Sequence, residues 1–214
     1  FDPGLGIATL NSAGNKDAFF MKLDVSGNYV YAKRLGGSGE DNANSISVDG
    51  NGNAFVTGSF NSSVADFDPG AGVVNLSSAG AHDAYIAKYD ATGNYMYARR
   101  FGAASGDDVG NSIAAYGNFN VFATGYFTDV VDFDPEAGVY NLGTSGTQNA
   151  FMIRLTNDFE ITASSGSNGS VTPSGTTLVL AETNQTYNIT PDAGYCIADV
   201  LIDSISTGPV GSFT

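Results

Sequence analysis

Apolar and polar residues alternate along short stretches of the chain, and Gly, Asn and Asp clusters separate these stretches. Alternation with a period of two is typical of β-strands, and no segment shows the spacing of a helix. The clusters at 49–53 (DGNGN) and 90–94 (DATGN) are typical of hairpin turns. The pattern predicts strands at 44–48 (NSISV), 54–60 (AFVTGSF), 83–89 (DAYIAKY) and 94–101 (NYMYARRF).

The third of these strands is apolar on both sides. Tyr85, Ala87 and Tyr89 alternate with Ala84 and Ile86, so both faces of its sheet carry residues that need cover. A sheet with one solvated face would alternate apolar with polar residues instead. The pattern therefore favours stacked sheets.

The same motifs return along the chain. FDPG at 1–4 recurs at 67–70 and as FDPE at 133–136, a spacing of 66 residues. The segments that follow also match: LNSAGNKDAFFMKLD (10–24), LSSAGAHDAYIAKYD (76–90) and LGTSGTQNAFMIRLT (142–156). A repeat of this length indicates one propeller blade or one solenoid coil per copy.

Residues 1–156 resemble the bacterial β-propeller repeat family (SBBP type). The resemblance is carried by the NSIxV and VTG pairs and by the DAFxxKLDxxGNxxYxxRxGG runs. It implies four-stranded antiparallel blades, with the FDPG segment (61–82) inserted between the second and third strands. The chain contains about two and a half copies, whereas propellers close with about four to eight blades. We therefore expect the missing blades of the same parent chain to be partners of this region.

The repeat ends after Thr156, and residues 157–214 have a different pattern of short strands and Gly, Pro and Asn turns. GSVTPSG and QTYNITPDAGYCIADVLID resemble the divergent internalin-B-type repeats of bacterial surface proteins over about 159–214. The resemblance implies a small β-sandwich-like or β-grasp-like spacer or adhesive module. The expected fold is all-β: a partial β-propeller followed by a small, truncated β-domain.

The charge balance narrows the classes of partner. Eight Lys and Arg residues face 22 Asp and Glu residues, which gives a formal net charge of −14. Phosphate backbones and anionic lipids repel such a chain, so we expect neither nucleic acid nor a membrane surface as partner. The sequence has no run of about 18 apolar residues, so we expect no membrane insertion. Low Lys content and abundant Gly, Ser, Asn and Thr favour an extracellular or cell-surface location.

The acidic residues gather in particular loops. In an antiparallel four-stranded blade, the loops before the first strand and after the second lie at the same end. Asp66, Asp68, Asp132 and Asp134 fall in these loops, and the D-F-D spacing places two carboxylates on one side of an extended segment. Hard oxygen ligands suit Ca²⁺, so these four residues are candidate calcium ligands. The alternative is turn chemistry, in which Asp binds its own backbone.

Basic residues also recur at fixed places in the repeat. A ligand clamp is one interpretation, and charged outer strands that keep edges soluble are the other, which we favour. They lie on the third and fourth strands of each copy: Lys22, Lys88, Arg154, Lys33, Arg34, Arg99 and Arg100.

The chain offers few groups for catalysis. His82 is the only histidine, and Lys16 and Gln148 replace it in the other copies, which indicates a loop position. Cys196, the single cysteine, is expected to be a buried structural thiol. We therefore expect a non-catalytic scaffold for adhesion or for protein or glycan interaction at the cell surface. The alternative is an accessory region of an extracellular hydrolase whose catalytic domain lies outside this sequence.

Overall fold

The computed structural model describes residues 1–117, 120–134, 138–143, 147–156, 158–180 and 184–214. These residues form antiparallel strands and no helix, which confirms the all-β fold class, and no helix in the described ranges could cross a membrane. The chain divides into two compact units, unit 1 (Phe1–Leu155) and unit 2 (Thr156–Thr214). The strands of unit 1 are β1 (Ala18–Leu23), β2 (Tyr29–Gly37), β3 (Asp41–Val48), β4 (Ala54–Phe60), β5 (Ala65–Asp66), β6 (Asn75–Leu76), β7 (Asp83–Tyr89), β8 (Tyr95–Phe101), β9 (Val109–Tyr116), β10 (Asn120–Phe127), β11 (Val130–Asp132), β12 (Asn141–Gly143) and β13 (Asn149–Thr156).

The central sheet of unit 1 is a complete four-stranded blade in the order β3-β4-β7-β8. Each strand pairs with the next one in sequence, apart from the insertion between β4 and β7. Strands β4 and β7 have the bounds that alternation predicts, whereas β3 begins three residues earlier than expected, at Asp41.

The hairpin turns of the blade are built on one aspartate each. Asp90 Oδ1 accepts hydrogen bonds from the backbone N–H groups of Thr92 (2.8 Å) and Asn94 (2.9 Å), and its Oδ2 accepts one from Asn94 Nδ2 (2.9 Å). Asp24 and Asp49 organise their turns in the same way. This is the turn chemistry expected for Asp and Asn.

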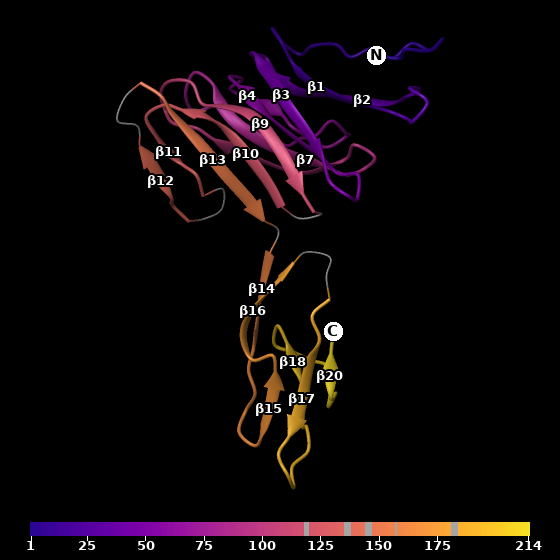
Figure 1. The fold of residues 1–214 in the computed structure, drawn as a ribbon, viewed down its shortest axis with the longest axis vertical. Coiled ribbons are helices and arrows are strands. Elements are labelled where there is room, and N and C mark those ends of the chain that lie inside the picture. The colour runs from indigo at the N-terminus through magenta and orange to yellow at the C-terminus, as the bar shows by residue number, and fades with distance from the viewer. Residues whose placement is uncertain (118–119, 135–137, 144–146, 157, 181–183) are drawn as a thin grey trace. The chain divides into compact units, whose positions relative to one another are not determined.

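Incomplete blades flank the central sheet on both sides (Figure 1). On one side, β1 and β2 correspond by the repeat to β7 and β8; on the other, β9, β10 and β13 correspond to β3, β4 and β7. Alternate residues of β7 serve two separate cores. Tyr85, Ala87 and Tyr89 pack with residues of β1 and β2, whereas Ala84 and Ile86 pack with residues of β9, β10 and β13.

The insertion between β4 and β7 forms a two-stranded hairpin, β5–β6, that joins the preceding blade. Ala65 and Asp66 pair with Gly37 and Gly36 at the end of β2, which gives a sheet in the order β1-β2-β5-β6. Phe67, next to this hairpin, is buried against Phe60 and Tyr85 of the central blade. The insertion is therefore a backbone link between consecutive copies.

Unit 2 is a set of small antiparallel sheets. Its sheets have the orders β14-β16, β15-β17-β20 and β18-β19. Its strands are β14 (Asp158–Ala163), β15 (Gly169–Thr172), β16 (Gly175–Leu180), β17 (Tyr187–Pro191), β18 (Leu201–Ile202), β19 (Ile205–Ser206) and β20 (Ser212–Phe213).

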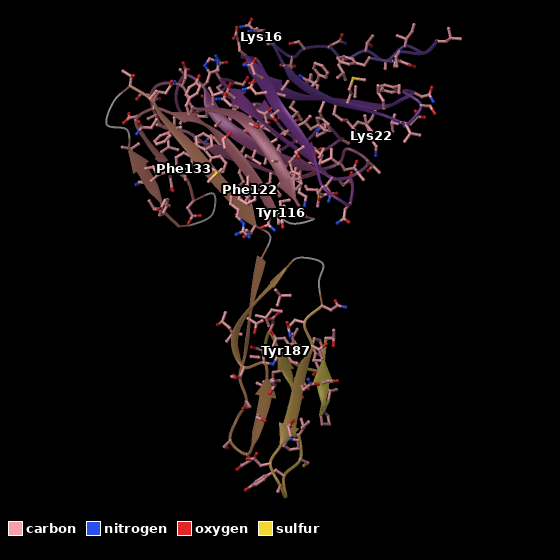
Figure 2. All side chains as sticks on the ribbon, viewed as in Figure 1. Lys16, Lys22, Tyr116, Phe122, Phe133 and Tyr187 are labelled. Atoms are coloured by element: carbon pink, nitrogen blue, oxygen red, sulfur yellow. The ribbon has the colours of Figure 1, made fainter. Side chains whose placement is uncertain are left out.

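The core of unit 2 is small. Val179 and Tyr187 are the buried hydrophobic side chains among its described residues, and Figure 2 labels Tyr187. Cys196 is exposed, so the expectation of a buried thiol was wrong, because this part of the unit offers no core in which to bury it.

Candidate interaction surfaces

The loops before the first strand and after the second lie together at one end of each blade, as the antiparallel order requires. Asn61 N–H donates to Glu40 O (3.1 Å), and Gly39 N–H donates to the Ser62 hydroxyl (2.7 Å). The next copy repeats the contact through Thr128, whose hydroxyl donates to Ser105 O (3.3 Å). These loops, which are distant in sequence, therefore lie together at one end of the blades. We call this end the loop end; it includes residues 39–40, 61–62, 105–107 and 128.

Two of the four candidate calcium ligands, Asp66 and Asp132, hold their own loops in shape through their carboxylates. Asp66 Oδ1 accepts from the backbone N–H groups of Asp68 (3.0 Å) and Val74 (2.9 Å). Asp132 Oδ1 accepts from Asp134 N–H (3.0 Å) and Tyr140 N–H (2.8 Å). The bond from Tyr140, followed by that from Asp134, lowers the pKa of Asp132.

Among the described residues, no group of three or more His, Cys, Asp or Glu side chains is arranged around a metal position. Turn chemistry thus accounts for the D-F-D spacing, and calcium binding by Asp66, Asp68, Asp132 and Asp134 stays a prediction.

A second set of acidic residues is buried where two blades meet. Asp83, fully buried at the start of β7, accepts a hydrogen bond from Arg100 Nη1 of β8 (2.5 Å). Asp17 and Arg34 make the same ion pair one copy earlier (2.8 Å). The sequence interpretation placed these arginines among solubilising charges, and the signal it missed is that Asp and Arg recur together, 17 residues apart.

Each blade junction also buries the aspartate that follows the fourth strand. Asp41 Oδ2 accepts from Gly37 N–H (2.7 Å) and from the Ser62 hydroxyl (2.9 Å). Asp108, its counterpart, accepts from Ala103 N–H (2.9 Å) and Thr128 N–H (2.8 Å). Burial raises the pKa of both carboxyl groups, because loss of water penalises the charged form.

Lys88 is another basic residue whose surroundings differ from those expected. The position was expected to carry charge on a solvated outer strand, but Lys88 is buried and its ammonium lies over the ring of Phe55, 5.1 Å from the centroid. Its counterpart Lys22 is exposed and donates to Ala91 O (2.9 Å). The ring over Lys88 comes from β4, the strand paired with β7 in the same blade, whereas β1 is an edge strand in the described part of its sheet.

The outer faces of the flanking blades are open. Phe19 of β1 occupies the repeat position of Tyr85, yet 48% of Phe19 is exposed compared with 1% of Tyr85. Met152 of β13 occupies the position of Ile86, and 75% of Met152 is exposed compared with 2% of Ile86. Strand positions that are buried in the central sheet are therefore largely exposed on both flanks, although the ring of Phe1 contacts Phe19 (centroids 4.8 Å apart).

The first strands of adjacent blades also touch through polar groups. Asn44 Nδ2 of β3 donates to Gly110 O of β9 (2.9 Å), and the Ser45 and Ser47 hydroxyls accept from backbone N–H groups of β9. The NSIS motif is thus a blade-to-blade contact. Asn111 and Ser112 repeat its first two residues on β9, where both are exposed.

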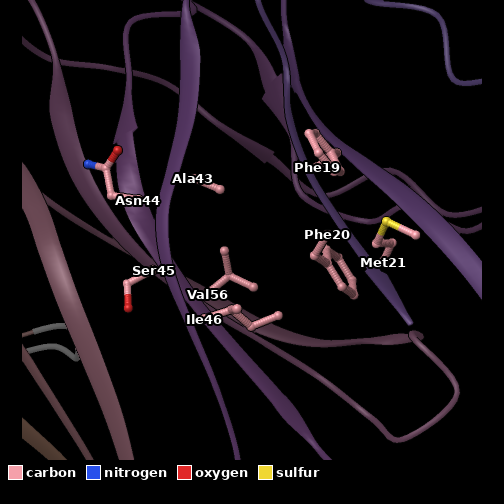
Figure 3. Close-up of a pocket in the computed structure, with 8 residues that line it drawn as sticks. All are labelled: Phe19, Phe20, Met21, Ala43, Asn44, Ser45, Ile46 and Val56. Atoms are coloured by element: carbon pink, nitrogen blue, oxygen red, sulfur yellow. The ribbon is translucent and has the colours of Figure 1, made fainter. Parts of the chain in front are cut away.

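A cleft lies beside β1, on the side away from β2. It has a volume of about 270 Å³. Figure 3 shows Phe20 and Met21 of β1 across from Ile46 of β3 and Val56 of β4. In the central blade, β4 pairs with the corresponding side of β7. The cleft therefore marks the position that the second strand of the same blade would fill.

His82 pairs with an acidic residue of the neighbouring loop. Its Nδ1 is 2.8 Å from Asp107 Oδ1 of the neighbouring loop, which makes it part of the same loop contacts as the Lys16–Glu40 pair (Figure 2 labels Lys16).

These features define an all-β protein with one complete four-stranded antiparallel blade and an incomplete copy of that blade packed on each of its faces. Residues 30–64 match the family model of the beta-propeller repeat, which confirms the resemblance for that segment. A viral protein described as an uncharacterized WD repeat-containing protein, from Acanthamoeba polyphaga mimivirus, is 28% identical over 160 residues. The alignment covers 70% of this chain and 11% of the viral protein. The chain is thus a repeat scaffold of the propeller type, and the resemblance of 159–214 to internalin-B-type repeats stays a prediction.

Proposed function

We propose that this chain is a non-catalytic scaffold segment of an extracellular or cell-surface protein, that its open faces bind further blades of the same repeat, and that its loop end contacts a surface protein or glycan. The observation that carries the proposal is the contrast between Tyr85 and Ile86, buried in the central blade, and Phe19 and Met152, exposed at the same repeat positions. In the central blade, neighbouring blades cover the side chains at these positions. A further blade is therefore the partner that fits the exposed positions on the flanks.

Two further observations support a blade as the occupant of the open faces. Asn111 and Ser112 present the groups with which Asn44 and Ser45 hold the next blade. The cleft beside β1 lies where the second strand of that blade would pair with β1. Apolar patches of this kind on a protein surface mark interaction sites. The net charge of −14 and the loop end rich in Asp fit an outer surface that contacts proteins or glycans rather than polyanions.

The blade-docking part of the proposal is tested by self-association of the chain. Open faces that fit a blade should make the chain associate with itself, so sedimentation velocity should show an average mass that rises with concentration. Met152→Asp and Phe19→Asp should shift the equilibrium toward the monomer. Val73→Asp, an exposed apolar position in the insertion loop, is the matched control and should change nothing. A chain that stays monomeric at all concentrations would contradict docking through these faces.

The partner is tested with a glycan array and with purified surface proteins of the source cells. Binding that needs the loop end should weaken when Glu40 and Asp107 are changed to Lys, whereas a mutation on an open face should not affect it. The absence of any glycan or surface-protein partner would remove the interaction role and leave only the structural one. Labelling of intact cells with an antibody to this chain tests the location independently.

A further inference from the structure

Three buried oxygen atoms lack a hydrogen-bond partner at the junction between the β1–β2 blade and the central blade. They are Asp17 Oδ1, Asp41 Oδ1 and the Tyr85 hydroxyl. Tyr85 and Asp41 are 1% and 2% exposed, and the Asp17 side chain is 4% exposed. An unpartnered buried polar atom costs about 1–3 kcal/mol, so three at one junction indicate a missing ligand.

Three segments of the fold carry these groups to the junction, where Asp41 lies near both of the others. Asp17 directly precedes β1, Asp41 opens β3 and Tyr85 lies in β7. Both carboxylates lie against Gly36: a Cβ on Gly36 would be 2.4 Å from Asp41 Oδ2 and 3.0 Å from Asp17 Oδ1. The ring of Tyr85 packs on Phe60, which is the strand partner of Asp41. The Asp41 carboxylate adds to the effect of burial in raising the pKa of Tyr85.

The next junction serves as an internal control. Asp83 and Asp108 occupy the positions of Asp17 and Asp41, and each of their carboxylate oxygens accepts at least one hydrogen bond. Phe151 stands where Tyr85 does and carries no hydroxyl. The first junction thus has an additional oxygen and two carboxylate oxygens left open, although the two junctions have the same backbone plan.

The chemistry of the three atoms points to a cation. Asp17 is paired with the Arg34 guanidinium, which is itself a third exposed, and Asp41 makes no ion pair within the part of the chain that the structure describes, so the two buried carboxylates carry excess negative charge. Carboxylate and hydroxyl oxygens are hard ligands, and Ca²⁺ accepts such oxygens together with water. We propose that Asp17, Asp41 and Tyr85 form a buried Ca²⁺ site that ties the two blades together. This site shares no residue with the D-F-D loops.

Calorimetric titration of CaCl₂ into the chelator-treated chain tests the site. Wild type should bind one Ca²⁺, and its thermal unfolding midpoint should rise with Ca²⁺ concentration. Asp41→Asn should abolish both effects. Tyr85→Phe should weaken binding by about tenfold, which corresponds to one lost polar contact. This variant should fold, because Phe19 and Phe151 stand at the same repeat position.

Two matched controls make the outcome decisive. Tyr89→Phe removes a buried hydroxyl that donates to Phe67 O (3.0 Å), away from the site, and should leave Ca²⁺ affinity unchanged. Asp66→Asn removes a carboxylate from the insertion loop and should also leave it unchanged. The proposal is overturned if wild type binds no Ca²⁺, if Tyr85→Phe and Asp41→Asn bind as wild type does, or if only Asp66→Asn loses binding.

Discussion

Strand β7 and its repeat counterparts β1 and β13 have nearly the same sequence pattern but very different surroundings. Every residue of β7 is buried, whereas β1 has two buried residues, Ala18 and Phe20, and β13 has one, Phe151. The pattern alone therefore does not determine burial in this protein. Because burial of apolar side chains stabilises a fold, we expect stability to be highest where a blade has neighbours on both faces and lowest at the margins of the stack, and matched substitutions measure this difference.

The largest effect is expected for core truncation. Ile86→Ala removes a side chain packed against the β9–β10–β13 blade and should lower the free energy of unfolding by about 2–5 kcal/mol. Met152→Ala, at the same repeat position, should change it by no more than about 0.5 kcal/mol. Urea unfolding followed by tyrosine fluorescence measures both. Equal costs at the two positions would mean that the open face of β13 is covered in solution.

Ion pairs should follow the same rule. Arg100→Met leaves the fully buried Asp83 carboxylate without its cation and should cost about 3 kcal/mol. Lys16→Met breaks the exposed pair with Glu40 (3.2 Å) and should cost less than about 1 kcal/mol. The same unfolding assay at low and at high salt separates the two, because only the exposed pair should depend strongly on ionic strength.

Substitution of two glycines by alanine compares the packing at the blade junction with that of an exposed turn. Gly36 has φ +135° and no room for a Cβ beside Asp41, so Gly36→Ala should cost about 2–3 kcal/mol. Gly27 has φ +81° with open space around it, so Gly27→Ala should cost about 1 kcal/mol from the backbone alone. Thermal unfolding of the two variants is the measurement, and the reverse order would contradict tight packing at the junction.

The smallest effect concerns pH and an exposed turn. Hydrogen bonds from Asn94 and Thr92 lower the pKa of Asp90 to about 2. A lowered pKa means that the charged form stabilises the fold above pH 4 and that this contribution is lost as the pH falls from about 4 to 2. Asp90→Asn should therefore cost less than about 1 kcal/mol at pH 6 and nothing near pH 2, given solvent screening. A cost that does not vary with pH would assign the effect to turn geometry instead.

The sequence predicted the strands of the central blade well because alternation and Asp-Gly-Asn turns are local signals. It also predicted the two-sided burial of Tyr85 and Ile86, since both faces of that strand are apolar. It did not reveal the pairing of β5 with β2 or the Asp17–Arg34 pair, because both depend on where blades meet. The D-F-D spacing likewise could not distinguish a metal ligand from a turn, since Asp66 has the same local sequence in either case.

The hairpin β5–β6 makes consecutive copies overlap, because it belongs to one copy in sequence and to the sheet of the preceding copy in the structure. Because Ala65 and Asp66 add to the sheet of the copy before them, the 66-residue sequence period is not the smallest piece that can stand alone. A single copy placed in another protein would carry a hairpin with no sheet to extend. We therefore expect such copies to be duplicated in tandem. An engineer who shortens or recombines this protein should therefore cut inside an exposed turn such as 24–28 and move two consecutive copies together.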